Sequence, residues 1–110
     1  MSASFLNNNR NKRSITLDLK SPSGVDAVKR LAATSDVVVQ NFRPGVVERL
    51  GVGEEELRAV KPDLIYVSIS GFGEIGPYSN RPVYDPIVQA LSGLASVQGG
   101  SDKARPRLVR

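Results

Sequence analysis

The 110-residue sequence contains no cysteine, no histidine and no tryptophan. Without cysteine it has no disulfide bond, no thiolate nucleophile and no cysteine-ligated zinc site. Without histidine it has no Ser-His-Asp triad, no histidine base and no histidine-ligated metal. No apolar run approaches the roughly 20 residues that span a bilayer, and no signal peptide opens the chain. We therefore expect a cytoplasmic protein with no metal site and no membrane partner.

What is present is typical of a globular protein, with 40% apolar and 24% charged residues. These fractions argue against wholesale disorder, and the length fits one small domain. The sequence has no internal repeat and no linker-like segment, so residues 1–110 are expected to form a single unit.

Positive charge is concentrated at the two ends of the sequence, within residues 1–20 and 101–110, and the formal net charge is +4. Basic ends suit an anionic partner such as a nucleic acid, a membrane surface or a phosphorylated small molecule. The alternative is an ordinary solvated surface. Only 5% of residues are aromatic, and none lies among the basic residues of 10–13. Single-strand binders use aromatic stacking platforms, so nucleic acid is the weaker choice of partner.

Periodicity and turn residues predict alternating strands and helices. The expected elements are a loop over 1–13, a strand over 14–19, a helix starting at Ser21-Pro22, a strand over 36–40 buried on both faces, a helical turn over 46–50, a helix over 54–60, a strand over 64–69 and a helix over 86–97. Parallel strands require crossover helices of this kind. The sequence therefore predicts an α/β fold, a Rossmann-like parallel sheet with flanking helices. Three strands make a narrow sheet, so we expect a segment of a larger α/β protein.

Cationic and amide side chains follow the predicted strands. Lys20 comes after the first strand, Asn41, Phe42 and Arg43 come after the second, and Arg49 lies in the following turn. Ligands of open α/β sheets bind at the carboxyl ends of the strands, and arginine suits phosphate. This rim is expected to bind an adenine nucleotide with several phosphates. The alternative is a turn with ordinary surface charges.

Two further motifs have weaker functional interpretations. Residues 71–76 match the G-x-G-x-x-G pattern, but Pro77 follows at once and no helix opens there. The dinucleotide fingerprint needs a helix N-terminus, so a glycine loop is the better interpretation. Asp85 precedes Pro86, which favours a helix N-cap over a nucleophile or base.

Read together, several stretches resemble the family III CoA-transferases, the CaiB/BaiF group that includes formyl-CoA transferase and α-methylacyl-CoA racemase. They occur in the family's order and at its spacing from about Phe5 to Arg107. The stretches are residues 9–15, 17–20, 36–45, 62–73, 76–78 and 84–85.

The resemblance implies a coenzyme A site, with an acyl-CoA and a small carboxylic acid as substrates and no covalently bound cofactor. By position in the family's motifs, the CoA contacts are Leu17, Lys20, Asn41, Phe42, Arg43, Arg49, Arg81 and Tyr84. This set overlaps the rim that was expected from strand ends and charge. The implied partners include no nucleic acid and no membrane.

In transferases of this family an Asp carboxylate attacks the acyl-CoA thioester and gives a mixed anhydride, which CoA thiolate converts to an aspartyl-CoA thioester. The resemblance places that Asp beyond Arg110, and places the family's first strand and helix before residue 9. Residues 1–110 are therefore expected to be part of an N-terminal domain, to contain no catalytic residue and to be inactive alone. The parent enzyme is expected to be a homodimer.

Two alternatives to acyl transfer remain. Racemase members of the family have a histidine acid/base where this sequence has Tyr84, whose ordinary pKa of about 10 suits that role poorly. Transfer between acyl-CoA and carboxylate is therefore favoured over racemisation. The second alternative is a non-catalytic adaptor that binds an anionic polymer through the basic ends of the chain.

Overall fold

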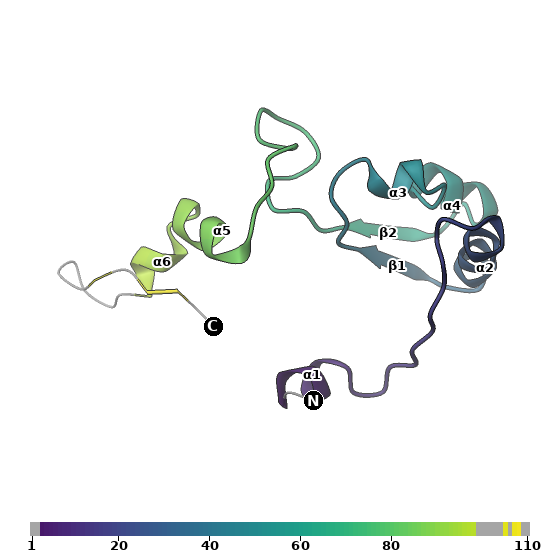
Figure 1. Cartoon of the computed structure of the whole chain (residues 1–110), viewed down its shortest axis with the longest axis horizontal. Helices are drawn as coiled ribbons and strands as arrows, with labels where there is room; N and C mark the ends of the chain where they lie inside the picture. The colour runs from purple at the N-terminus through teal and green to yellow at the C-terminus, as the bar shows by residue number, and fades with distance from the viewer. Residues whose placement is uncertain (1–2, 99–104, 106, 109–110) are drawn as a thin grey trace.

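The structure of the chain is a computed structural model that describes residues 3–98, 105 and 107–108. Helices and a small parallel sheet alternate along the chain, as the sequence predicts (Figure 1). In chain order the elements are α1 (Ala3–Asn8), α2 (Pro22–Ala33), β1 (Val37–Gln40), α3 (Val46–Arg49), α4 (Glu54–Val60), β2 (Ile65–Ser68), α5 (Asp85–Leu91) and α6 (Leu94–Val97).

The start of α2 follows the sequence prediction. Ser21 has an extended backbone, its side-chain oxygen accepts the Gly24 N–H at 3.1 Å, and Pro22 takes the first helical position. A serine cap satisfies one of the N–H groups that have no partner inside the helix, and proline loses nothing where its missing N–H is not needed. The predicted helices at 46–50 and 54–60 are also present, as α3 and α4.

The sheet consists of β1 and β2, which pair in parallel with Val37 opposite Ile65 and Gln40 opposite Ser68. The parallel pairing confirms the predicted α/β topology. The predicted strand over 14–19 is wrong, because these residues have no strand conformation and Ile15 is exposed. Figure 1 shows the chain between α1 and α2 running away from the sheet. Alternating polar and apolar residues do not by themselves form a strand, because the backbone N–H and C=O groups of a strand also need a neighbouring strand to pair with.

Two predicted boundaries are wrong. Residues 3–8 form helix α1 instead of a loop, although none of its residues is buried. The helix predicted over 86–97 is interrupted at Ser92 and Gly93 and becomes α5 and α6. Tyr84 occupies the N-cap position of α5, and Asp85, the predicted cap, is the first residue of the helix.

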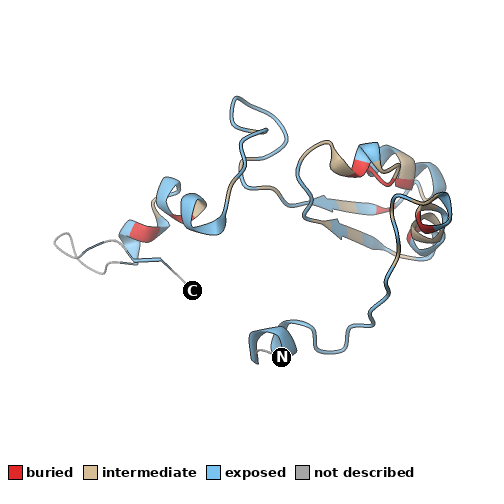
Figure 2. Cartoon of the chain, viewed as in Figure 1, coloured by how far each residue is buried: buried red, intermediate tan, exposed pale blue. Residues whose placement is uncertain are grey.

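The core lies on one side of the sheet, between β1–β2 and helices α2, α3 and α4 (Figure 2). Its buried residues are Ala32, Val47, Val52, Leu57 and Leu64. Val38 and Tyr66 point into it, whereas Val37 and Val39 are 47% and 60% exposed. The prediction that this strand is buried on both faces is therefore wrong, because α3 and α4 cover only one face in the described chain.

The chain as a whole is extended, with a Cα radius of gyration of 17.9 Å. A compact domain of 100 residues has a radius of gyration of about 13 Å. The difference arises because α1 and the α5–α6 pair lie apart from the β1–β2 core (Figure 1). In the described residues, no helix has the length and apolarity that crossing a membrane requires.

Candidate ligand-binding clefts

Lys20 is held by a tight turn directly before α2. The Asp18 carboxylate accepts the Lys20 backbone N–H at 3.0 Å, and the Asp18 carbonyl accepts the Ser21 N–H at 3.1 Å and the Ser21 hydroxyl at 2.8 Å. An aspartate that bonds the backbone two residues on is a common turn former. Asp18 is exposed, and it fixes the backbone of Lys20 next to the capped helix.

Arg49 is placed by a second turn, at the carboxyl end of β1. The Arg43 carbonyl accepts the Val46 N–H at 3.1 Å, and Gly45 between them has φ +78°. This is a type II turn, which favours proline at its second position and requires a positive φ at its third, so the Pro44-Gly45 pair fits it. Helix α3 begins immediately and carries Arg49, whose guanidinium lies against Gly45.

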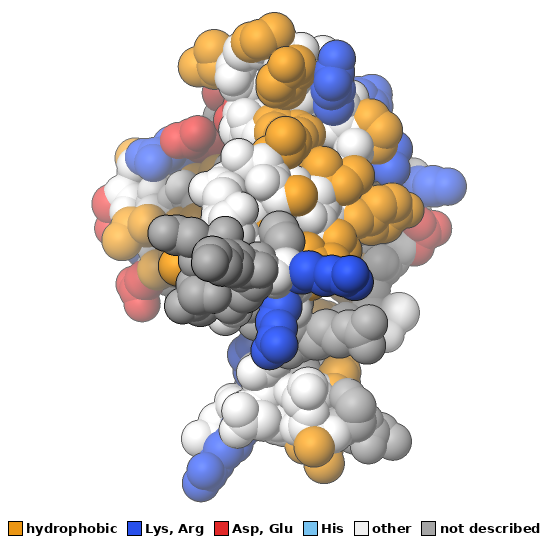
Figure 3. All heavy atoms as spheres, turned by 90° about the vertical axis from the view of Figure 1, so that its left-hand side faces the viewer, with side chains coloured by type: hydrophobic (Ala, Val, Ile, Leu, Met, Phe, Trp, Pro, Cys, Tyr) orange, Lys and Arg blue, Asp and Glu red, His pale blue; other side chains and the backbone are white. Residues whose placement is uncertain are grey.

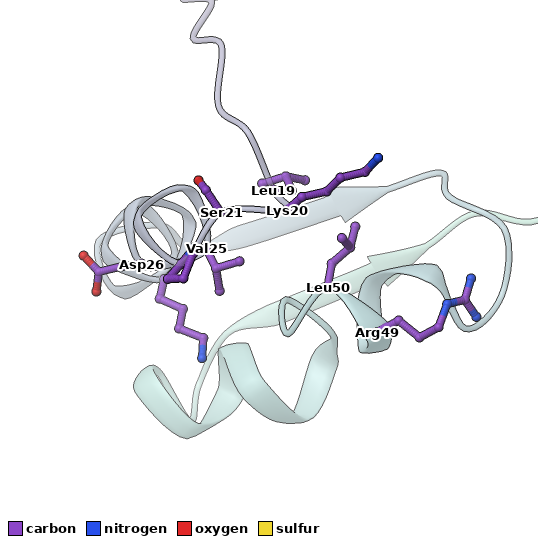
Figure 4. Close-up of a pocket in the computed structure, with 9 residues that line it drawn as sticks. Leu19, Lys20, Ser21, Val25, Asp26, Arg49 and Leu50 are labelled. Carbon is purple, nitrogen blue, oxygen red and sulfur yellow. The ribbon is translucent and has the colours of Figure 1, made fainter.

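The two turns bring Lys20 and Arg49 to one cleft of about 570 Å³, the Lys20–Arg49 cleft. Figure 4 shows the Lys20 ammonium and the Arg49 guanidinium toward the carboxyl ends of the strands, with the Asp26 carboxylate at the opposite side. Lys29, which the sequence interpretation missed, also lines the cleft. The available signal was its position four residues after Val25, on the same face of α2.

Asn41, Phe42 and Arg43 line a second cleft of about 130 Å³ together with Arg81, the Asn41–Arg81 cleft. The Asn41 side-chain amide donates to the Ile69 carbonyl at 2.7 Å. This amide therefore joins the ends of β1 and β2, a structural use that sequence reasoning did not assign. Phe42 is 45% exposed, which leaves an aromatic face available in the cleft.

Three arginines, Arg43, Arg49 and Arg81, line a third cleft of about 150 Å³, the arginine cleft. The Arg81 guanidinium lies 4.4 Å from the centre of the Tyr78 ring, and Tyr78 packs against Phe72 with ring centres 5.7 Å apart. A cation over an aromatic face is attracted by the ring's quadrupole, which orients Arg81 without neutralising it.

Tyr84 lines a fourth cleft of about 370 Å³, the Tyr84 cleft, with Asn41 at its boundary. Asp85 also lines it, and the Asp85 carboxylate accepts a hydrogen bond from the Gln89 side chain. Within α5 this carboxylate therefore has a structural partner.

Neighbouring clefts share lining residues. Arg49 lines both the Lys20–Arg49 cleft and the arginine cleft, Arg43 and Arg81 line the arginine and Asn41–Arg81 clefts, and Asn41 continues into the Tyr84 cleft. Seven of the eight residues expected at the site thus lie along one series of clefts. Leu17 is half-buried and lines none of these four clefts.

The electrostatics of the series are cationic. Within the described residues, the ion pairs are Asp26–Arg30, Glu54–Arg58 and Lys61–Asp63, and none involves a cation of the predicted site. Below the sheet, burial raises the pKa of Tyr66, and the negative charge of nearby Glu48 acts in the same direction.

The glycine loop, residues 71–82, has no helix, as the sequence interpretation expects. The basic stretch predicted at 101–110 falls largely outside the described residues, apart from Arg105, Arg107 and Leu108. No group of three carboxylates suited to a metal ion occurs in the part of the chain that the structure describes.

Comparison with known proteins gives a consistent result. The family model described as CoA-transferase family III matches residues 1–110. The chain is 47% identical over 98 residues to mouse succinyl-CoA:glutarate CoA-transferase, covering 89% of this chain and 22% of the relative. It is 46% identical over 94 residues to formyl-CoA:oxalate CoA-transferase of Rhodopseudomonas palustris, covering 86% and 22%. The chain thus spans less than a quarter of the length of these two relatives.

Solved structures agree at the level of the fold. A CaiB/BaiF family protein from Brucella suis superposes with a TM-score of 0.80 at 41% identity, covering 89% of this chain and 26% of that protein. A crystal structure of Rv3272 from M. tuberculosis superposes with a TM-score of 0.77 at 38% identity, covering 93% and 28%.

Proposed function

The chain belongs to CoA-transferase family III, and on that premise we propose that it forms the CoA-binding part of an enzyme that moves CoA between an acyl-CoA thioester and a carboxylic acid. One observation carries the proposal. Four clefts that share lining residues follow one another from Lys20 and Arg49 through Arg43 and Arg81 to Tyr84, and their cations are gathered toward one end. CoA has the same polarity, because a phosphorylated nucleotide is joined by a long neutral arm to the reacting sulfur.

The proposed orientation follows from this polarity. Lys20 and Arg49 contact the phosphates of the nucleotide, and Arg43 and Arg81 extend the cationic surface through the arginine cleft. Guanidinium groups bind phosphate oxygens through paired hydrogen bonds, which also fix the orientation of the ligand. The pantetheine arm then passes Asn41 and Phe42, and the thioester lies toward Tyr84.

We propose a dicarboxylic acid as the acceptor class. Relatives are named for glutarate, malate, citramalate and oxalate, all of which are dicarboxylic acids. We propose that this part of the protein supplies binding and that the attacking carboxylate is the Asp that the family resemblance places beyond Arg110. Asp85 accepts a hydrogen bond from the Gln89 side chain and has no such role in the proposal. Tyr84 in place of a histidine favours transfer over racemisation.

Calorimetry on the whole protein tests CoA binding. Wild type is expected to bind CoA more tightly than 3′-dephospho-CoA. Lys20→Ala is expected to weaken CoA binding by about three- to tenfold. A single exposed ion pair contributes about 0.2–1 kcal/mol, and a contact with phosphate adds charged hydrogen bonds. Lys12→Ala is the matched control and is expected to leave CoA affinity unchanged.

The same pair of variants separates the rival function. Lys12 belongs to the basic N-terminal stretch that an anionic polymer would contact, whereas Lys20 lines the cleft. Binding of RNA or DNA with a steep dependence on salt, weakened in Lys12→Ala and accompanied by no heat with CoA, would replace the transferase proposal with the adaptor.

We further propose that the whole enzyme is a cytoplasmic homodimer. The dimer is what the family resemblance implies. In residues 1–110, Val37, Val39, Ile65, Val67 and Ile69 leave one face of the sheet exposed, and either the rest of the same chain or a second copy must cover it. Figure 3 shows further hydrophobic side chains on the face that it views. Monomeric soluble proteins rarely expose contiguous apolar patches of this kind. Light scattering is expected to give twice the mass of one chain, and a monomer at micromolar concentration would contradict the dimer.

A further inference from the structure

A chain of side-chain hydrogen bonds connects the glycine loop to the backbone of the segment that follows β1. The Ser68 hydroxyl donates to the Glu74 carboxylate, and the Gln40 amide donates to the Ser68 oxygen at 2.7 Å. The Gln40 carbonyl oxygen in turn accepts the backbone N–H of Phe42 at 2.7 Å. We call these four residues the Glu74–Phe42 relay.

The relay begins where the sheet ends. The backbone pairing of β1 and β2 finishes at Gln40, whose carbonyl accepts the Ile69 N–H at 3.0 Å. Beyond that point, side-chain hydrogen bonds join the two segments in place of backbone pairing. The Gln40 side chain donates to the hydroxyl of Ser68, which lies directly opposite, and the Asn41 side chain donates to the Ile69 carbonyl. Polar side chains on β2 and in the glycine loop therefore restrain the backbone at Phe42, and the Asn41 side chain ties the end of β1 to the Ile69 carbonyl.

We propose that Gln40, Ser68 and Glu74 are positioning residues that hold the Asn41–Arg43 segment in the geometry that binds CoA. This proposal rests on the proposed function for the identity of the ligand. Gln40 and Ser68 each donate one hydrogen bond and accept another, so removing either breaks two links at once. A carboxylate acceptor at the end of the relay strengthens the adjacent bond, and connected hydrogen bonds polarise one another.

A physical consequence is that the glycine loop and the Phe42 backbone depend on each other. Gly73 and Gly76 adopt positive φ in the exposed loop, and Glu74 lies between them. The Ser68–Glu74 bond attaches this loop to β2, and the relay passes the restraint to the residues that line the Asn41–Arg81 cleft. Loss of Glu74 is therefore expected to loosen a segment that Glu74 does not contact.

The first experiment needs no ligand. Hydrogen exchange of the Phe42 amide in the whole protein is expected to accelerate by about three- to tenfold in Ser68→Ala and in Glu74→Ala, because its acceptor is no longer held. Ser68→Thr keeps a hydroxyl and Glu74→Gln keeps an acceptor, so both are expected to restore protection. Glu55→Ala, an exposed glutamate on α4, is the matched control and is expected to change nothing.

The second experiment measures the transferase reaction. Ser68→Ala is expected to raise the KM for the acyl-CoA by about three- to tenfold while kcat stays within about twofold, since the relay orients the binding segment and touches no reacting atom. Ser68→Thr is expected to recover the KM. Should Ser68→Ala fail to fold, Glu74→Ala in the exposed loop tests the same relay.

Unchanged Phe42 exchange in both Ser68→Ala and Glu74→Ala would overturn the relay, whether or not the protein binds CoA. Accelerated exchange with an unchanged KM would overturn its positioning role. A wild-type protein with a protected Phe42 amide and no affinity for CoA would instead contradict the proposed function and leave the relay as a fold element without that ligand.

Discussion

Arg49→Ala is expected to weaken CoA binding by about ten- to a hundredfold in the whole protein, measured by calorimetry. Arg49 lines both the Lys20–Arg49 cleft and the arginine cleft, so its removal affects two neighbouring parts of the proposed phosphate site. A hydrogen bond to a charged group contributes about 1.5–3 kcal/mol, and about 1.4 kcal/mol corresponds to tenfold in affinity.

Two further variants show whether the guanidinium itself matters. Arg49→Lys keeps the charge but loses the planar pair of donors, so we expect an intermediate loss of affinity. Arg58→Ala on α4 removes an arginine whose ion pair with Glu54 lies outside the clefts, and it is expected to bind CoA as the wild type does. Equal affinities for wild type and Arg49→Ala would contradict the proposed phosphate site.

Gly71→Ala is expected to lower the free energy of unfolding by about 1–3 kcal/mol and to weaken CoA binding. Gly71 packs directly against Val83, and an added Cβ would lie 1.9 Å from the Val83 Cγ1 atom. Valine is stiff at χ1, so the two backbone segments must separate. These segments are the start of the glycine loop and the residues after it, and both line the Asn41–Arg81 cleft. Urea unfolding and calorimetry measure the two effects.

A second substitution at the contacting residue is the control for this clash. Val83→Ala removes the Cγ1 atom that meets the new methyl group, so the double variant Gly71→Ala/Val83→Ala is expected to be more stable than Gly71→Ala alone. This non-additivity is the signature of two residues in contact. A double variant whose loss equals the sum of the single losses would show that the close approach is not the cause.

The parts of the fold that the sequence predicts are those with strong local signals. The Ser21-Pro22 helix start and the valine-rich strand at 36–40 each depend on the chemistry of adjacent residues. The strand predicted at 14–19 fails for a different reason, because pairing needs a distant neighbour that alternation alone does not specify. The burial of that valine-rich strand likewise depends on which helices cover it, and α3 and α4 cover one face.

The residues of the candidate site also differ in whether local sequence or three-dimensional neighbours determine their place. Placing Arg43 just after a strand required only the expected topology. Lys20 was expected there because of a strand at 14–19 that does not form, and it reaches its cleft through the Asp18 turn instead. Arg49 lines the same cleft from helix α3. The contributions of Lys29 and of the Ser68 hydroxyl were missed, because each depends on three-dimensional neighbours. The identity of the ligand came from the family resemblance, since cations at strand ends suit many phosphorylated molecules.

The valines on both faces of β1 have a consequence for how the strands align. Sliding one strand past the other by a single residue normally exposes apolar side chains, which penalises the slip. A shift of β1 by one residue would replace the valines on one face of the strand with a valine from the other face. Burial of apolar side chains therefore discriminates only weakly between the two registers. Gln40 meets Ser68 only in the observed alignment. The Gln40–Ser68 hydrogen bond thus also favours the observed register of the two strands. A substitution of Gln40 or Ser68 is therefore expected to affect both the strand register and the proposed ligand-binding segment.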